Sequence, residues 1–145
     1  MRLNIDCVRD ILLCVEENTD LRRHCCFYDL NFMPTPTYVW DKPEEPAAYQ
    51  KALLQKYSND VLAYHIHYCI ECDLIVESEY TNAYCTFISD LTPMGHDFIA
   101  NMRNDTFYNK VKEISKELGL NTLNDLIQIA THCASTIVKS YFNIP

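Results

Sequence analysis

One stretch of the chain places three zinc-binding side chains on one helical face. His65, Cys69 and Cys72 are spaced i, i+4 and i+7, and zinc favours thiolate and imidazole ligands in a tetrahedral set. Residues 24–26 (His-Cys-Cys) could supply a fourth ligand. Structural zinc sites usually take a Cys-x-x-Cys pair from a turn, whereas this pair falls inside a predicted helix. The pattern therefore favours buried thiols, and we expect no metal and no cofactor.

No acid, base and nucleophile converge elsewhere in the sequence. His132 and Cys133 are adjacent, and neighbouring residues on a helix point away from each other. Glu44 and Glu45 lie in a proline-rich stretch, where a solvated surface is expected. The chain has only 2 glycines, which excludes a glycine-rich phosphate loop. We therefore expect that the protein is not an enzyme.

The composition is that of a globular chain, with 145 residues, 48% hydrophobic and 22% charged. The first 18 residues contain four acidic side chains, and no uninterrupted hydrophobic segment follows them. We therefore expect neither a signal peptide nor a membrane span, and a cytoplasmic protein. In that compartment the eight cysteines are expected to be reduced.

Local signals predict an α+β chain with the order helix, strand, helix, helix, hairpin, helix, followed by two more helices. Asn4 and Thr122 are predicted helix caps, Thr92-Pro93 starts a helix, and Gly119 stops one. The expected helices cover about 4–18, 47–57, 60–72, 92–103, 105–119 and 122–142, and the expected strands cover 24–31, 74–81 and 84–91. This order is typical of a winged helix-turn-helix domain, expected over residues 1–103, with a helical extension over 104–145.

Three segments in this order resemble a known family: MRLNIDCVRDILL, DVLAYHIHYCIECDLI and ISDLTPMGHDFIANMRND. They are similar to a domain-of-unknown-function group of small phage and prophage proteins of Gram-positive bacteria, close to the YjcQ-like proteins. The resemblance covers about residues 1–105 and implies a winged-helix fold without an established activity. The Leu91-Thr92-x-x-Gly95 start of the helix after the wing also occurs in winged-helix regulators. Asp73 departs from the family, which has a glycine there, although aspartate tolerates the left-handed conformation.

The charge distribution argues against DNA binding through the predicted third helix and wing. Residues 58–101 contain seven acidic residues and no lysine or arginine, a net charge of −7. The remaining residues have a net charge of only −1. DNA affinity depends on basic residues that neutralise phosphates. An acidic surface kept for solubility is one interpretation, and a surface directed at a basic partner is the other. Any DNA contact would depend on Arg2, Arg9, Arg22, Arg23 and Lys42.

Two apolar features could also contact partners. Tyr38 and Trp40 lie in a loop framed by prolines, which suits an interaction hot spot, unless the loop folds back and Trp40 caps the core. The last helix has a wide apolar stripe that must pack on the first helix or on a second copy. We expect a homodimer, by analogy with winged-helix proteins. The stripe consists of Leu123, Leu126, Ile127, Ala130, Cys133, Ala134, Ile137, Val138 and Tyr141.

The sequence leads to one main hypothesis and two alternatives. The main hypothesis is a phage-type accessory protein that binds a basic protein, such as a host defence or transcription component. The alternatives are a DNA-binding regulator and a binder of a small signalling molecule. The residues expected to contact the partner are Tyr38, Trp40, Tyr64, His67, Glu71, Asp73, Glu77 and Glu79.

Overall fold

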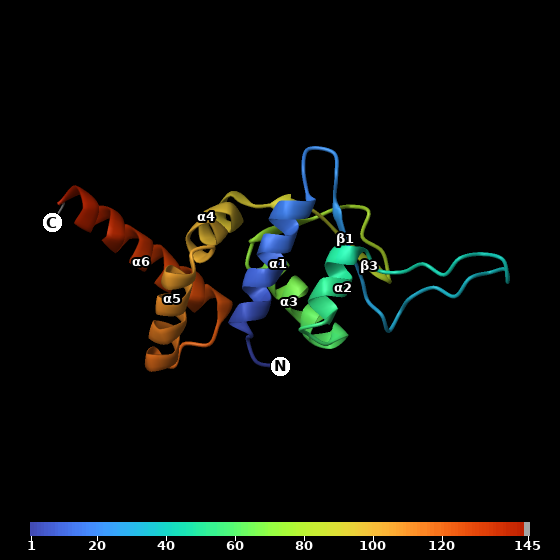
Figure 1. Ribbon diagram of the computed structural model, residues 1–145, viewed down its shortest axis with the longest axis horizontal. Coiled ribbons are helices and arrows are strands. Elements are labelled where there is room, and N and C mark those ends of the chain that lie inside the picture. Colours follow the sequence, from blue (N-terminus) through green and yellow to red (C-terminus); the bar gives the residue numbers. More distant parts are fainter. Residues whose placement is uncertain (144–145) are drawn as a thin grey trace.

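The computed structural model describes residues 1–143, which form six helices and three strands (Figure 1). In chain order they are α1 (Ile5–Asn18), β1 (Cys25–Tyr28), α2 (Ala48–Leu54), α3 (Asn59–Glu71), β2 (Ile75–Glu77), β3 (Cys85–Leu91), α4 (Pro93–Met102), α5 (Asp105–Leu118) and α6 (Leu123–Phe142). This mixed α+β order agrees with the order expected from the sequence. None of the helices in the described part is long and apolar enough to cross a membrane.

Side-chain caps begin most of the helices. In each case an oxygen accepts a hydrogen bond from a backbone N–H in the first turn, which satisfies a donor that has no partner within the helix. Gly119 ends α5 with a left-handed φ of 66°. The expected caps and the expected stop are therefore confirmed. The capping residues are Asn4, Ser58, Thr92, Asn104 and Thr122.

The turn between α3 and β2 is held by the first turn of α4. Asp73 has a φ of 58°, so aspartate occupies the left-handed position where glycine was expected. The Thr92 hydroxyl donates to the Asp73 carbonyl, and the Thr92 N–H donates to the Leu74 carbonyl at 3.0 Å. Gly95 donates its N–H to the Thr92 hydroxyl oxygen and lies directly against the Leu74 backbone. The motif that begins at Leu91 thus connects the first turn of α4 to the turn between α3 and β2.

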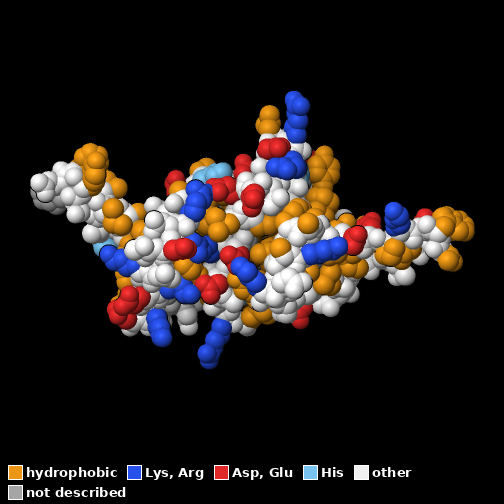
Figure 2. Space-filling model, viewed as in Figure 1, with side chains coloured by type: hydrophobic (Ala, Val, Ile, Leu, Met, Phe, Trp, Pro, Cys, Tyr) orange, Lys and Arg blue, Asp and Glu red, His pale blue; other side chains and the backbone are white. Residues whose placement is uncertain are grey.

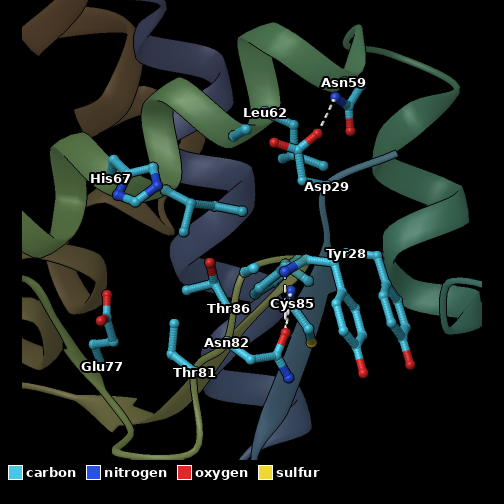
Figure 3. Close-up of a pocket in the computed structure, with 15 residues that line it drawn as sticks. Tyr28, Asp29, Asn59, Leu62, His67, Glu77, Thr81, Asn82, Cys85 and Thr86 are labelled. Atoms are coloured by element: carbon cyan, nitrogen blue, oxygen red, sulfur yellow. Dashed lines mark hydrogen bonds between the residues drawn. The ribbon is translucent and has the colours of Figure 1, made fainter. Parts of the chain in front are cut away.

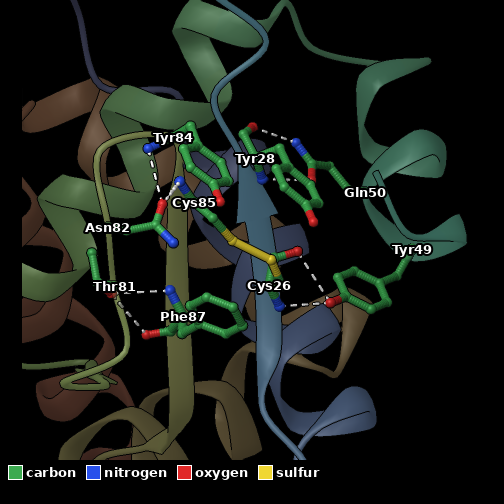
Figure 4. Close-up of a disulfide and its surroundings, with 9 residues drawn as sticks. All are labelled: Cys26, Tyr28, Tyr49, Gln50, Thr81, Asn82, Tyr84, Cys85 and Phe87. Carbon is green, nitrogen blue, oxygen red and sulfur yellow. Dashed lines mark hydrogen bonds between the residues drawn. A yellow bond between two sulfur atoms is a disulfide. The ribbon is translucent and has the colours of Figure 1, made fainter. Parts of the chain in front are cut away.

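The sheet is antiparallel with the order β1-β3-β2, and the side chains of α2 close its β1 edge (Figure 4). The Tyr49 hydroxyl accepts from the Cys26 N–H at 2.6 Å and donates to the Cys26 carbonyl at 3.1 Å. The Gln50 side chain, which is fully buried, makes the same pair of contacts with the Tyr28 backbone, at 2.9 and 2.7 Å. These two side chains replace a neighbouring strand, so β1 offers no free edge for pairing with another chain.

β2 is shorter than expected because the chain turns at Ser78. The Thr81 N–H donates to the Ser78 carbonyl, and the Tyr80 N–H donates to the Ser78 hydroxyl oxygen. Thr81 then contacts β3, where the Phe87 N–H donates to its hydroxyl at 3.0 Å (Figure 4). The residues between β2 and β3 therefore form an irregular but hydrogen-bonded connection.

Cys26 and Cys85 are joined by a disulfide across β1 and β3, with their Cα atoms 6.4 Å apart (Figure 4). Cys26 is opposite Phe87 and Cys85 is opposite Tyr28, so the two cysteines are diagonal neighbours in the sheet. The expectation that every cysteine is reduced is therefore wrong for this pair. The two cysteines are 59 positions apart in the sequence, and their pairing depends on the strand register. The free cysteines are Cys7, Cys14, Cys25, Cys69, Cys72 and Cys133.

The core is built around α1, which packs against α3, α4 and β3. The inward face of α1 is completely buried and includes Ile11 and Leu12. α5 is attached to α1 by polar contacts as well. Arg9 lies over the Tyr108 ring at 4.3 Å, and the Tyr108 hydroxyl donates to the Asp6 carboxylate. The exposed side of α3 is left free by this arrangement.

α6 is divided into a buried half and an exposed half. Residues 123–133 place their apolar side chains mainly against α4 and α5, rather than against α1, which was the expected intramolecular contact. The remainder of the helix extends beyond the body of the protein (Figure 1). Its exposed apolar residues are Ile137, Val138, Tyr141 and Phe142.

Candidate interaction surface

The acidic residues of segment 58–101 have almost no partners within the protein. Seven ion pairs are present in the described part of the chain, and six of them lie outside this segment. Within it, only Asp90 has an ion-pair partner, His96, at 3.5 Å. On the face shown in Figure 2, by contrast, Lys and Arg side chains are mixed with Asp and Glu side chains. Ion pairs outside the segment include Arg9–Asp105 and Lys56–Asp10. The uncompensated negative charge is therefore concentrated around α3 and β2.

Six of the eight predicted contact residues lie on this acidic part of the molecule, and all six are exposed. Tyr64, His67 and Glu71 follow one another at helical spacing on α3, with the Tyr64 ring edge-on to Tyr68 at 5.9 Å. The other three lie in the turn after α3, at the end of β2 and in the β2–β3 connection. They are Asp73, Glu77 and Glu79.

A groove with a volume of about 140 Å³ lies between α3, the end of β1 and the β2–β3 connection (Figure 3). We call it the α3 groove. Asp29 follows β1, His67 belongs to α3, and Glu77 ends β2, so its charged and titratable residues come from three elements. Its apolar lining comes from Phe27, Leu62, Ala63 and Ile66. The groove thus combines an apolar lining with carboxylates and contains no lysine or arginine.

The rim of the α3 groove is ordered by short-range contacts. The Asn82 side-chain oxygen accepts from the N–H groups of Tyr84 and Cys85, at 3.0 and 2.9 Å (Figure 4). Tyr28 and Tyr84 are stacked, with centroids 6.2 Å apart and an interplanar angle of 6°. Burial, and then the nearby Glu44 carboxylate, raise the pKa of Tyr28, so its hydroxyl stays protonated.

The long loop between β1 and α2 (residues 29–47) starts beside this groove and is attached to the first residues of α3. The Asp29 carboxylate accepts from the Asn59 side chain at 3.0 Å, and the Asn59 side-chain oxygen accepts from the Leu30 N–H at 2.9 Å. The Asn31 side chain donates to Asp60 at 3.1 Å. The start of the loop and the N-terminus of α3 are therefore joined by three side-chain hydrogen bonds.

The tip of this loop projects into solvent (Figure 1). The Tyr38 and Trp40 rings stack with centroids 4.9 Å apart, and the Asp41 N–H donates to the Tyr38 carbonyl at 3.1 Å. Trp40 is 79% exposed and Val39 is completely exposed. The alternative in which Trp40 caps the core is therefore wrong, because most of its side chain is in contact with solvent. The tip is a preformed aromatic turn.

The alternative zinc site is not formed. The His65 ring is fully buried, its Nε2 accepts from the Asn4 N–H at 2.8 Å, and its Nδ1 donates to the Val61 carbonyl at 2.7 Å. Both ring nitrogens are thus occupied by backbone groups. Burial raises the pKa of the Cys69 and Cys72 thiols, which disfavours the thiolates that zinc requires. Within residues 1–143, no three His, Cys, Asp or Glu side chains are grouped as metal ligands would be.

Several residues of the α3 groove carry no signal in the sequence that points to a site. Asp29, Asn82 and Tyr84 each have an ordinary local interpretation as a turn or strand residue. Their common position depends on the pairing of β1 with β3 and on the packing of α3 against the sheet. No short-range pattern in the sequence contains that information.

The comparisons with curated proteins and with solved structures gave no match. A family model described as "Hypothetical protein (DUF2513)" matches residues 37–121. The matched residues run from within the long loop to just after α5. They therefore begin and end later than residues 1–105, over which the sequence resembles the phage and prophage group. The matched segment includes α3, the hairpin and the α3 groove, and it covers more than half of the 145 residues. The chain therefore belongs to the DUF2513 family of hypothetical proteins.

Proposed function

We propose that this protein is a non-enzymatic accessory protein of phage or prophage type, which binds a basic surface on a protein partner. A host defence or transcription component is the natural target type, and inhibition of host defence is one role that such binding would serve. The observation that carries the proposal is the uncompensated acidic surface around α3 and β2, where five carboxylates have no ion-pair partner in the described chain.

A winged-helix fold over residues 1–103 is part of this proposal. Its support is the order of the first elements, together with a three-stranded sheet in which β3 lies between β1 and β2. In that fold α3 is the recognition helix and the β2–β3 segment is the wing, and both usually face DNA. Residues 104–145 would be a helical extension. The fold does not set the function, so the chemistry of the surface has to decide between partners.

The surface chemistry favours a protein over DNA. A duplex would place its phosphates against unpaired carboxylates, with no basic side chain on α3 or the hairpin to release counterions. A basic protein would instead be attracted, and its association rate would fall as salt rises. The exposed Tyr38 and Trp40 rings add the aromatic contacts that dominate many protein interfaces.

The compartment that we propose is the cytoplasm. Six free cysteines fit a reducing environment, whereas the Cys26–Cys85 disulfide is the feature that argues against it.

A DNA-binding regulator is the second candidate, and it would have to use basic residues outside α3 and the hairpin. Two of the five N-terminal candidates are already neutralised, Arg9 by Asp105 at 2.7 Å and Arg23 by Asp20 at 3.5 Å. The five basic residues do not share one helix, strand or loop. They are distributed over the N-terminus, α1, the α1–β1 loop and the tip of the long loop. This distribution makes DNA the weaker candidate.

Charge reversal tests the proposal. We expect the triple variant Glu71→Lys, Glu77→Lys, Glu79→Lys to lose at least about tenfold in affinity for a basic partner captured from the host cell, because it replaces attraction by repulsion. The binding of the wild type should weaken as the salt concentration rises. Affinity capture with mass spectrometry, followed by calorimetric titration, measures both effects.

The matched control carries the same change of charge on other exposed surfaces: Glu17→Lys, Glu113→Lys and Glu117→Lys. It should retain the partner. Duplex DNA is titrated in parallel at low salt, and the wild type should bind more weakly than about 10⁻⁴ M. Micromolar DNA binding that is lost on replacing Tyr64 or His67 by alanine would reject the proposal in favour of the regulator.

We also propose that the exposed end of α6 pairs with a second copy of the chain. Its apolar side chains are exposed, whereas those of residues 123–133 are mostly buried against α4 and α5. Lys139 is the only charged residue between 134 and 142. We expect the double variant Ile137→Glu, Tyr141→Glu to be a monomer in light scattering, while the wild type is a dimer. Glu117→Lys on α5 is a control that should not change the mass. A monomeric wild type at high concentration would contradict this expectation.

A further inference from the structure

We infer that the α3 groove receives a single arginine side chain of the protein partner. This inference rests on the proposed function, because it assigns one residue of the basic partner to one site on the acidic surface. Neither the sequence pattern nor the family identifies this groove as a site.

The size of the groove limits its occupant. Pockets for small organic ligands usually have volumes of about 300–1,000 Å³, whereas the α3 groove has about 140 Å³. That volume suits one long side chain rather than a nucleotide-sized molecule. The third hypothesis from the sequence, a small signalling molecule, is therefore not favoured at this site.

The lining of the groove matches a side chain that is apolar along its stem and cationic at its end. Leu62 and Ile66 line the groove and form an apolar wall against which a methylene stem can pack. Asp29 uses one carboxylate oxygen for Asn59 and the Asn31 N–H, while its other oxygen has no hydrogen bond within residues 1–143. Glu77 has neither a hydrogen bond nor an ion pair through its side chain in the same part of the chain. Both carboxylates can therefore accept from an incoming cation.

The aromatic rim favours arginine over lysine. Tyr28 and Tyr84, whose rings are stacked (Figure 4), both line the groove. A planar guanidinium can stack on tyrosine and can bind a carboxylate in a bidentate manner. The protein already contains such an arrangement elsewhere, where Arg9 lies over the Tyr108 ring and donates to Asp105. A lysine ammonium is more strongly hydrated and lacks the planar face.

The experiment uses the full chain and a peptide probe, Gly-Ser-Gly-Arg-Gly-Ser-Gly. Control peptides replace the arginine by citrulline, which keeps the shape without the charge, or by lysine. Binding is followed by ¹H–¹⁵N NMR at low salt. We expect millimolar binding with shifts at the amides of Ala63, Thr81, Asn82 and Thr86, and an affinity about tenfold higher for arginine than for citrulline.

Two variants with the same loss of charge separate the groove from the surface as a whole. Glu77 lines the groove, whereas Glu79, two residues later, does not. We expect Glu77→Gln to weaken arginine binding by about fivefold and Glu79→Gln by less than about twofold. Ala63→Leu fills the groove without a change of charge and should abolish the shifts. Circular dichroism confirms that each variant is folded, and Glu77→Gln tests the site even if Ala63→Leu does not fold.

The outcomes distinguish this inference from the proposed function. If Glu77→Gln and Glu79→Gln weakened binding of the arginine peptide equally, and Ala63→Leu bound it normally, the groove would not be the binding site. The acidic surface as a whole would then be the binding region. Equal or tighter binding of the lysine peptide would overturn the assignment to arginine. No binding of the arginine peptide, together with a partner that is sensitive to the charge-reversal triple variant, would reject the groove alone. If the arginine peptide did not bind and the partner bound the charge-reversal triple variant as well as the wild type, both the groove and the proposed function would be rejected.

Discussion

Replacing Gly95 by alanine is expected to destabilise the protein by about 3 kcal/mol or more, and to lower its Tm by about 10 °C. A Cβ at this position would lie 2.0 Å from the Leu74 carbonyl oxygen. That oxygen cannot move away, because it accepts from the Thr92 N–H and because the Leu74 N–H is bonded to the Cys69 carbonyl at 2.9 Å. The higher helix propensity of alanine offsets only about 1 kcal/mol of this cost.

Urea unfolding followed by circular dichroism measures this effect. Met94→Ala is the control, since Met94 occupies the preceding position in α4 and is 46% exposed. It should change the free energy of unfolding by about 0.5 kcal/mol or less. If Gly95→Ala were as stable as the wild type, the first turn of α4 could not lie against the backbone of Leu74.

Replacing His65 by alanine is expected to destabilise the protein by about 3 kcal/mol. The substitution leaves a cavity in the core and removes the acceptor for the Asn4 N–H at the start of α1. His67→Ala is the matched control, because it lies two residues later on the same helix and is exposed. That control should have an effect of about 0.5 kcal/mol or less. Similar losses in the two variants would show that His65 does not join α1 to α3.

The same histidine should make the stability depend on pH. Burial lowers the pKa of His65 below its usual value, since Nε2 must stay unprotonated to accept from the Asn4 N–H. The unfolded chain takes up this proton near pH 6.5 and the folded chain only at lower pH. Stability is therefore complete above about pH 6.5 and decreases as the pH falls below it. Asp6, whose pKa is lowered by Tyr108 and Lys112, contributes only in a more acidic range.

Urea titrations between pH 7.5 and pH 5 measure this dependence. We expect the free energy of unfolding of the wild type to fall over this range and that of His65→Ala to change less. The pH range tested lies above that in which Asp6 titrates, so the two groups can be separated. If the free energy of unfolding depended on pH in the same way in both proteins, His65 would not be the cause of that dependence.

Features that depend on neighbouring residues could be predicted from the sequence. The caps Asn4, Thr92 and Thr122 and the stop at Gly119 involve hydrogen bonds to residues no more than about four positions away, so their signals are local. The left-handed conformation at Asp73, by contrast, was implied by the resemblance to a family with glycine at this position. The acidic character of segment 58–101 is a property of composition. These local signals were enough for the order of the elements and for the location of the negative charge.

Features that depend on distant segments were decided only by the tertiary structure. The disulfide requires Cys26 to lie diagonally to Cys85, and this position depends on the pairing of β1 with β3, which itself packs against α1. The exposure of Trp40 depends on the course of the whole loop between β1 and α2, which no local signal determines. The α3 groove and the division of α6 arise in the same manner, from contacts among three or more elements. Such contacts form because together they lower the free energy of the whole chain. That total depends on residues far apart in the sequence, so it cannot be read from any short segment.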